Sequence, residues 1–372
     1  MVVPVDYVGP VAGQTIHPQS SRRGHAGRMA RLPSTSRVIT GEVAWYLAGR
    51  LSDAERMDYA LATNAVVLRG ASGARAGVRL RKAGFTGSLW LDPAAYDSLQ
   101  APLAETLFDD YWQSVQQELQ VEELISPGSY VGQGDINGLE SALDAEREWV
   151  ANAGGRLSLA LPASWLVRDL HALLGRLTRV DVPLALAFAD RNDPLGRVGA
   201  VQGLVDLLRS VNDVAVVRSD LGALGAVSYG ASLGAIGTST TVRHVVPPGK
   251  TGGGRHDDKS PSVFVAELLD YKLGSHLDEF PAKASPTCDL PCCRGKMLRR
   301  FNGEHSVAEA RVHNRISIGE VARRVMETPP ELRPAAFAAL CRSAEHAVAE
   351  LSLLARRRLT VRPQVKAWAR VH

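Results

Sequence analysis

Short apolar runs alternate along the chain with stretches of helical periodicity, beginning at about residue 64. Each run ends in a polar, Gly or Pro cluster, and several runs are continuously apolar. Continuous apolar runs are typical of parallel strands that are covered on both faces. Seven strands are predicted, at 65–71, 87–93, 121–128, 156–163, 182–190, 214–220 and 233–240, with 38–43 as a candidate for an eighth.

Helical stretches separate these runs, among them 164–178, 199–211 and 221–232. Ser164 stands where an N-cap would begin the first of them. Alternating strands and helices indicate an α/β fold, and eight strands match a closed (β/α)8 TIM-type barrel over 37–246. A doubly wound open sheet is the alternative, but the G-x-G-x-x-G turn after an early strand is missing. The barrel is therefore predicted.

The strand–helix pattern ends near residue 245. Segment 247–287 is predicted to be a loop and a connecting stretch, and its Gly-rich part, 247–262, is expected to form a mobile cover over the barrel mouth. The remaining part, 288–372, combines a Cys/His segment with helices. Ser306 and Pro329 stand where helix starts are expected. The sequence thus predicts a barrel that carries a C-terminal helical appendage.

The composition indicates a globular protein with a full core, because 45% of the 372 residues are apolar. No run of 18 apolar residues is present, so a membrane span is not expected. The basic segment 1–36 has no apolar stretch behind it and is predicted to be a flexible arm. Three of the four cysteines lie within six residues, unlike a secreted disulfide framework, which favours a cytoplasmic protein. The fourth, Cys341, is predicted to be a core residue.

The charge is unevenly distributed, although the net value is only +4. Residues 294–372 hold 16 Lys and Arg against seven Glu and no Asp, and residues 1–40 hold five Arg against one Asp. The middle of the chain is correspondingly acidic. A basic C-terminal part predicts binding of a polyanion such as a nucleic acid. The alternative is an ordinary solvated helical surface that is rich in arginine.

A metal site is predicted in the segment "CDLPCCRGKMLRRF". Cys288, Cys292 and Cys293, together with His313, supply the four soft ligands of a closed structural zinc site. Because successive side chains point apart, His305 is an alternative to one member of the adjacent cysteine pair. A closed set leaves no open position for water, so the zinc is expected to stabilise the fold. The alternative is three unrelated thiols.

Catalytic groups of a barrel lie at the carboxyl ends of its strands. Asp92 and Asp190 follow predicted strands and are candidate bases or nucleophiles. Aspartates at such positions also serve as helix N-caps, which is the role predicted for Asp220. The substrate-binding candidates at strand ends are Ser126, Arg218, Ser239, Arg243 and His244.

These features together resemble the tRNA-guanine transglycosylases and their relatives that act on 7-deazaguanine bases in tRNA or DNA. Cys288, Cys293 and His313 match the spacing of that family's zinc ligands, and "ARVHNRISIGEVARRV" is similar to the helix around its zinc histidine. "LWLDPAAYD" resembles the region of the family's early aspartate motif, with Asp92 at the aspartate. The sequence departs from the family pattern in three ways. Leu290 replaces a cysteine, Asp92 is followed by Pro-Ala-Ala where the family has Ser-Gly-Gly, and the last strand lacks the nucleophilic aspartate.

The resemblance implies a protein that exchanges or recognises a guanine or 7-deazaguanine base in tRNA or DNA. It also implies a structural Zn²⁺ and a homodimer formed through the helices on the zinc side. With the family's nucleophile missing, Asp92 or Asp190 would have to form the covalent partner that retaining glycosyl transfer requires. Two alternatives remain, a non-catalytic relative that binds nucleic acid or a partner protein, and an unrelated barrel enzyme acting on a small molecule.

Overall fold

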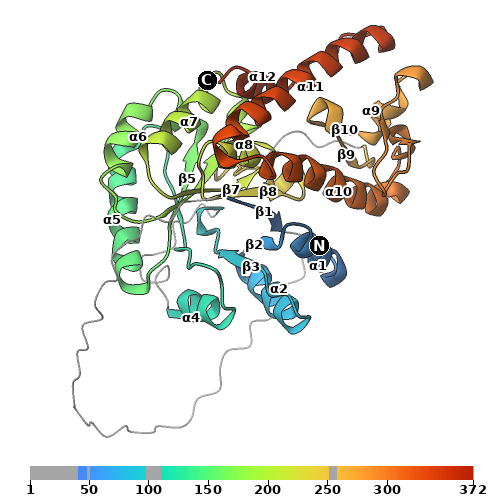
Figure 1. Ribbon diagram of the computed structural model, residues 1–372. Coiled ribbons are helices and arrows are strands. Elements are labelled where there is room, and N and C mark those ends of the chain that lie inside the picture. The colour runs from blue at the N-terminus through green and yellow to red at the C-terminus, as the bar shows by residue number, and fades with distance from the viewer. Residues whose placement is uncertain (1–40, 48–50, 98–109, 251–257, 372) are drawn as a thin grey trace, which may run out of the picture. The chain divides into compact units, whose positions relative to one another are not determined.

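Figure 1 shows the computed structural model, which describes residues 41–47, 51–97, 110–250 and 258–371. The predicted N-terminal arm, 1–36, lies outside the described residues, and so does part of the predicted cover over the barrel mouth.

Eight parallel strands form one curled sheet in the cyclic order of a TIM-type barrel. Their hydrogen-bonded order is β3-β2-β1-β8-β7-β6-β5-β4, and every pairing within the sheet is parallel. The strands are β1 (Glu42–Leu47), β2 (Ala65–Arg69), β3 (Ser88–Asp92), β4 (Ser129–Tyr130), β5 (Leu157–Pro162), β6 (Leu184–Ala189), β7 (Val214–Ser219) and β8 (Leu233–Gly237). The predicted fold class is confirmed.

Helices follow the strands and cover the outer face of the sheet (Figure 1). They are α1 (Asp53–Thr63), α2 (Gly70–Lys82), α4 (Asp110–Glu118), α5 (Ile136–Ala153), α6 (Leu170–Leu177), α7 (Ala200–Ser210) and α8 (Gly222–Ser228). Helix α1 begins with a capping box, in which Ser52 and Glu55 satisfy each other's backbone N–H groups. Asp220, predicted to be an N-cap, lies one residue before the N-cap Leu221, and it accepts a hydrogen bond from the N–H of Gly222 at the start of α8.

The strand predicted at 121–128 was placed too early in the chain. Within that range Ile125 makes only an isolated parallel bridge with Arg156, and β4 begins after the range has ended. Pro127 has no N–H to donate, and Gly128 has a φ of 90°, so the strand cannot continue through this pair of residues.

The two ends of the sheet order, β3 and β4, are joined by backbone hydrogen bonds outside the regular strands. The N–H of Glu122 donates to the carbonyl of Leu89 on β3 at 2.8 Å. Beyond the end of β3, the N–H of Ala95 donates to the carbonyl of Pro127 at 3.1 Å. These bonds hold the loop after β3 close to the segment that leads into β4.

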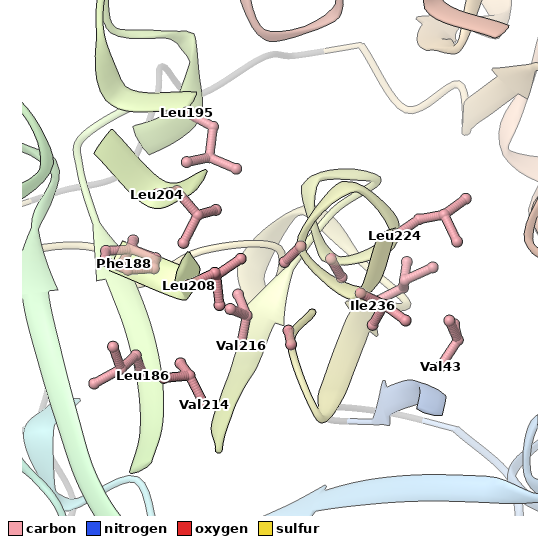
Figure 2. Close-up of a cluster of buried hydrophobic side chains, with 14 of the residues drawn as sticks. Val43, Leu186, Phe188, Leu195, Leu204, Leu208, Val214, Val216, Leu224 and Ile236 are labelled. Carbon is pink, nitrogen blue, oxygen red and sulfur yellow. The ribbon is translucent and has the colours of Figure 1, made fainter. Parts of the chain in front are cut away.

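Large and small apolar side chains alternate along the strands and fill the two faces of the sheet differently. Along β6, Leu184, Leu186 and Phe188 belong to the cluster shared with the helices, whereas Ala185, Ala187 and Ala189 belong to the barrel interior. Figure 2 shows Leu186 and Phe188 in the same group as Leu204 and Leu208 of α7. Because small side chains dominate the interior, it has room for a few large aromatic ones, including Tyr46 and Trp90.

The helix starts predicted at 199 and 221 lie one residue before those of α7 and α8, whereas the start predicted at 164 is wrong. The helix expected over 164–178 begins at Leu170, because Ser164 lies buried in a separate 3₁₀ turn. Ser306 directly precedes α10 (Val307–Met326), as predicted. Pro329 precedes a 3₁₀ turn that leads into α11 (Arg333–Ala355).

The C-terminal part consists of two small hairpins and a group of helices. The pair β9 (Ser262–Val265) and β10 (Asp270–Leu273) is antiparallel, and so is the pair β11 (Thr287–Cys288) and β12 (Lys296–Met297). Helix α10 packs on β9 and on α1, and α11 packs on α8 and on α12 (Pro363–Trp368). Helix α9 (Gly274–Asp278) follows β10. Among the described residues, no helix is both long enough and apolar enough to cross a membrane.

Candidate functional site

The four predicted metal ligands converge at one place in the C-terminal part. Cys288 ends β11, Cys292 and Cys293 lie in the turn before β12, and His313 lies on α10. Their ligand atoms all lie within 4.8 Å of one another. Cys288, Cys293 and His313 are buried, and Cys292 is half-buried.

The spacing of the ligand atoms fits a tetrahedral ion. Nδ1 of His313 lies 3.3 Å from Sγ of Cys293 and 3.8 Å from Sγ of Cys292, and the two sulfurs are 3.6 Å apart. A tetrahedral zinc ion, with bonds of about 2.3 Å to sulfur and about 2.0 Å to nitrogen, separates its ligand atoms by roughly 3.5–3.8 Å. The donor set therefore fits an ion such as Zn²⁺.

The turn between β11 and β12 brings both members of the adjacent cysteine pair to the cluster. The N–H groups of Cys293 and Arg294 both donate to the carbonyl of Leu290, and Arg294 has a left-handed φ of 52°. Cys292 is the fourth member of the cluster. His305, the predicted alternative, is exposed and is not part of the cluster.

Hydrogen bonding orients the imidazole of His313. Its Nε2 lies 2.8 Å from the carbonyl oxygen of Phe264 on β9. A carbonyl can only accept, so the Nε2–H donates and Nδ1 is left to face the sulfurs. Burial lowers the pKa of His313, which favours the neutral ring that binds metals. The cluster thereby links the β11–β12 hairpin to α10 and β9.

Arg300 contacts the cluster from outside. Its guanidinium donates to Sγ of Cys293 at 3.1 Å and also pairs with Glu309 on α10. Three thiolates and a divalent ion carry a net charge of −1, so this cation balances the charge of the site. All four ligand positions are filled by protein atoms, and the ion would stabilise the fold.

Asp92 is fully buried at the carboxyl end of β3. Its Oδ2 accepts hydrogen bonds from the hydroxyls of Tyr46, at 2.7 Å, and Tyr96, and its Oδ1 accepts from the N–H of Ala94 at 2.8 Å. Burial raises the pKa of Asp92, whereas the tyrosine hydrogen bonds act in the opposite direction. The carboxylate therefore organises the loop after β3.

Arg218 reaches a second carboxylate of the same loop. Asp97 accepts two hydrogen bonds from the guanidinium of Arg218, at 2.6 and 2.7 Å, and also pairs with Arg69 at the end of β2. Of these three residues, Arg69, Asp97 and Arg218, only Arg218 was predicted from the sequence to be a site residue. Asp97 ends the segment "LWLDPAAYD", and Arg69 lies near the end of the predicted strand 65–71.

The other candidates at strand ends differ in their burial and in their partners. Asp190 is largely buried and pairs with Arg197. Ser126 is fully buried, and its Oγ accepts from a backbone N–H of β5 at 2.8 Å, which is an internal role. Oγ of Ser239 lies 3.0 Å from Oγ1 of Thr241, just after β8.

Arg243 and His244 lie on the segment after β8, and both are half-buried. The guanidinium of Arg243 stacks on Tyr271, with its carbon 3.3 Å from the ring centroid. Nε of Arg243 and Nε2 of His244 are buried without hydrogen-bond partners among the described residues. Burial lowers the pKa of His244, so the ring is neutral at physiological pH.

The same segment lies across the carboxyl end of the barrel. Val245 forms a parallel bridge with Ala189 at the end of β6, and it exchanges hydrogen bonds with Phe188 and Asp190. Val242 and Val245 are buried in the cluster of the barrel interior. Apolar side chains therefore close the interior from this side.

A third group of charges joins the C-terminal segment to this face. Arg362 pairs with Asp220 at 2.8 Å, with Asp193 at 3.1 Å and with Asp270 at 3.5 Å. Gln364 donates a further hydrogen bond to Asp220 at 2.7 Å. Burial and the charge of Asp220 raise the pKa of Asp193 to about 7.

The chain matches no protein-family model, and no curated protein shows significant similarity to it.

Proposed function

We propose that the protein is a transglycosylase-like barrel that recognises a nucleic acid, tRNA or DNA, without exchanging its base. The observation that carries the proposal is the environment of Asp92. Its carboxylate is fully buried and accepts three hydrogen bonds from its own protein. A nucleophile that attacks a sugar must reach the substrate, and this carboxylate is instead used inside the barrel.

The remaining carboxylates at this face support a binding role. Asp190 pairs with Arg197, and Asp97 pairs with Arg69 and Arg218. Strand β8 and the residues that follow it, up to 246, contain no Asp or Glu. The carboxylates of Asp92, Asp97 and Asp190 therefore all have partners within the protein.

Cationic and polar groups around the same face provide contacts for phosphate. Arg191 directly follows Asp190 and is exposed, and Arg197 is half exposed. The buried nitrogens of Arg243 and His244 that lack partners add hydrogen-bonding capacity for a base or a phosphate. Phosphate contacts by such groups supply most of the affinity of non-specific nucleic-acid binding.

A matched pair of substitutions tests this proposal. Arg191 and Arg179 are both exposed and lie at opposite ends of β6. Arg191→Gln is expected to weaken binding of tRNA and DNA and to reduce the slope of log K against log salt by about 1. Arg179→Gln should leave both unchanged. Fluorescence anisotropy across a salt series gives both quantities, and equal effects of the two substitutions would contradict the proposal.

Base exchange is the second candidate function, because a buried carboxyl with a raised pKa is also a common feature of general acids. Incubation of the protein with tRNA or DNA and isotope-labelled guanine or 7-deazaguanine separates the two candidates. The proposal predicts that no label enters the nucleic acid, for wild type and for Asp92→Asn alike. Incorporation by the wild type that is lost in Asp92→Asn would establish the exchange reaction instead.

A further inference from the structure

Two guanidinium groups converge on one carboxylate at the carboxyl face of the barrel. Arg69 ends β2 and Arg218 lies near the end of β7, and both donate to Asp97. The side chain of Arg218 is 5% exposed and that of Asp97 is 20% exposed. The two guanidinium groups thus share the carboxylate of Asp97 in a place that is only partly open to water, and the buried Asp92 also interacts electrostatically with Arg218.

The fold holds Arg218 in position independently of Asp97. Arg218 is a non-glycine residue with a φ of 54°, at an irregularity of β7 between Val216 and Ser219. Its guanidinium also donates to the carbonyl of Thr241 at 3.2 Å. Left-handed residues of this kind cluster at binding and catalytic sites, where the surrounding structure keeps them in place.

Asp97, in contrast, is carried to the arginines by a short loop. The loop folds back because Ala94 donates its N–H to Asp92, and the N–H of Asp97 then donates to the carbonyl of Ala94. Asp97 is the last described residue before 110. The guanidinium groups are thus anchored on strands, whereas the carboxylate lies at the end of a loop.

We propose that Arg69 and Arg218 form a binding site for a phosphate group, and that the carboxylate of Asp97 occupies this site in the structure. The planar fork of a guanidinium binds carboxylate and phosphate oxygens with the same bidentate geometry. A phosphate group would offer the two guanidinium groups more oxygen acceptors than the single carboxylate of Asp97 does.

The loop after β8 adds polar groups beside Arg218. Thr241 supplies the carbonyl that Arg218 contacts, and its hydroxyl lies 3.0 Å from that of Ser239. In TIM-type barrels the loops after the seventh and eighth strands frequently form phosphate sites. The proposed ligand is therefore a phosphate group, either free or as part of a nucleic acid, and only the second source rests on the proposed function.

Substitution of Asp97 tests the site directly. Asp97→Asn removes the internal competitor, so the affinity for inorganic phosphate, measured by isothermal titration calorimetry at low salt, is expected to rise at least tenfold. The added substitution Arg218→Gln should abolish this gain. Asp53→Asn is the matched control, because Asp53 also bridges two arginines, Arg56 and Arg79, on the outer helices. An equal gain in the control, or no gain in Asp97→Asn, would overturn the proposal.

Thermal unfolding keeps the test decisive if Asp97→Asn folds poorly. Without its carboxylate partner the buried guanidinium of Arg218 lacks a counter-charge, so this variant should be less stable in chloride. Phosphate at equal ionic strength should restore its melting temperature, with a larger shift than in wild type or Asp53→Asn. A variant that phosphate does not stabilise would show that Asp97 serves only as a structural partner.

Binding of a single-stranded oligonucleotide distinguishes the sources of the phosphate. Tighter binding of both inorganic phosphate and the oligonucleotide by Asp97→Asn would support a nucleic-acid phosphate as the ligand. A gain for inorganic phosphate alone would keep this site and argue against the proposed function. Wild-type binding of nucleic acid with no gain for either ligand in Asp97→Asn would keep the proposed function and contradict this site.

Discussion

Single residues inside the barrel depend on partners from distant strands. Asp92 accepts hydrogen bonds from Tyr46 on β1 and from Tyr96 in the loop after β3, and all three residues are buried. Loss of one donor to a buried charged group costs more free energy than loss of a hydrogen bond at the surface. The hydroxyls of Tyr46 and Tyr96 therefore stabilise the protein through these hydrogen bonds, in addition to the packing of the tyrosine rings.

Substitution of Tyr46 by Phe is expected to lower the free energy of unfolding by about 2 kcal/mol, because it removes one donor to the buried carboxylate. Tyr59→Phe is the control, since Tyr59 is buried and its hydroxyl makes no hydrogen bond among the described residues. Its loss should stay below about 0.5 kcal/mol. Urea denaturation measures both values, and similar losses for the two variants would contradict this account.

The residue types at strand ends were predictable, but their partners were not. Asp92 and Arg218 were found because they follow apolar runs, a local pattern. Tyr46 is 46 residues away from Asp92, and Asp97 is 121 residues away from Arg218. Such pairs meet only when the sheet closes, so no local pattern of residues identifies them.

Among the elements, the β11–β12 hairpin is the least able to form by itself. Each of its strands has two residues, and isolated hairpins of far greater length are marginal in water. The Cys/His cluster supplies the missing free energy by joining the hairpin to His313 on α10. The ion is therefore expected to determine whether this element folds.

About one zinc ion per chain is expected by elemental analysis, and Cys293→Ser should lose it, because three remaining ligands bind less tightly than four. Hydrogen exchange should then rise in 287–297 and in the first turns of α10. Cys341→Ser is the control, since Cys341 is buried in α11, away from the cluster. Unchanged exchange in metal-free protein would contradict a structural role for the ion.

Strands and helices were predictable from the sequence where a single requirement, such as burial on both faces of the sheet, determined their residues. The runs that became β5, β6 and β7 are buried on both faces, so their apolar residues were continuous. Cysteine spacing indicated the cluster, but the turn that contains both Cys292 and Cys293 has no sequence pattern that shows both thiols reach the other ligands. Around 121–128 the apolar pattern predicted a strand that Pro127 and Gly128 interrupt.

The C-terminal segment is tied to the barrel as a whole by Arg362. Its partners Asp193, Asp220 and Asp270 come from the residues after β6, the residues after β7, and β10. Burial tends to raise the pKa of Asp220, but Arg362 and two hydrogen bonds hold it below its usual value. Of the carboxylates around Arg362, Asp193 is therefore the one that takes up a proton near neutral pH.

Asp193→Asn is expected to change how stability depends on pH. A pKa of about 7 in the folded protein, above the value in the unfolded chain, means that folding favours the protonated form. The stability that this provides is complete below pH 4 and is lost as the pH rises through 7. The neutral Asn avoids this loss, so the variant should gain on the order of 1 kcal/mol relative to wild type at pH 8.

Chemical denaturation at several pH values between 4 and 8 measures this difference. Asp181→Asn is a suitable control, because Asp181 is exposed in the loop before β6. A difference between Asp193→Asn and wild type that does not vary with pH would show that Asp193 is not the titrating group.

The pairing of β1 with β8 has a consequence for synthesis of the chain. Trp45 on β1 lies opposite Ile236 on β8, so roughly 190 residues separate the partners. At a translation rate of about 5–20 residues per second, the ribosome needs on the order of 10–40 s to supply β8 after β1 has emerged. Throughout that interval one edge of the apolar strand β1 has no partner and is open to association with other chains. The nascent protein therefore depends on protection of its first strands until the last strand of the barrel has been made.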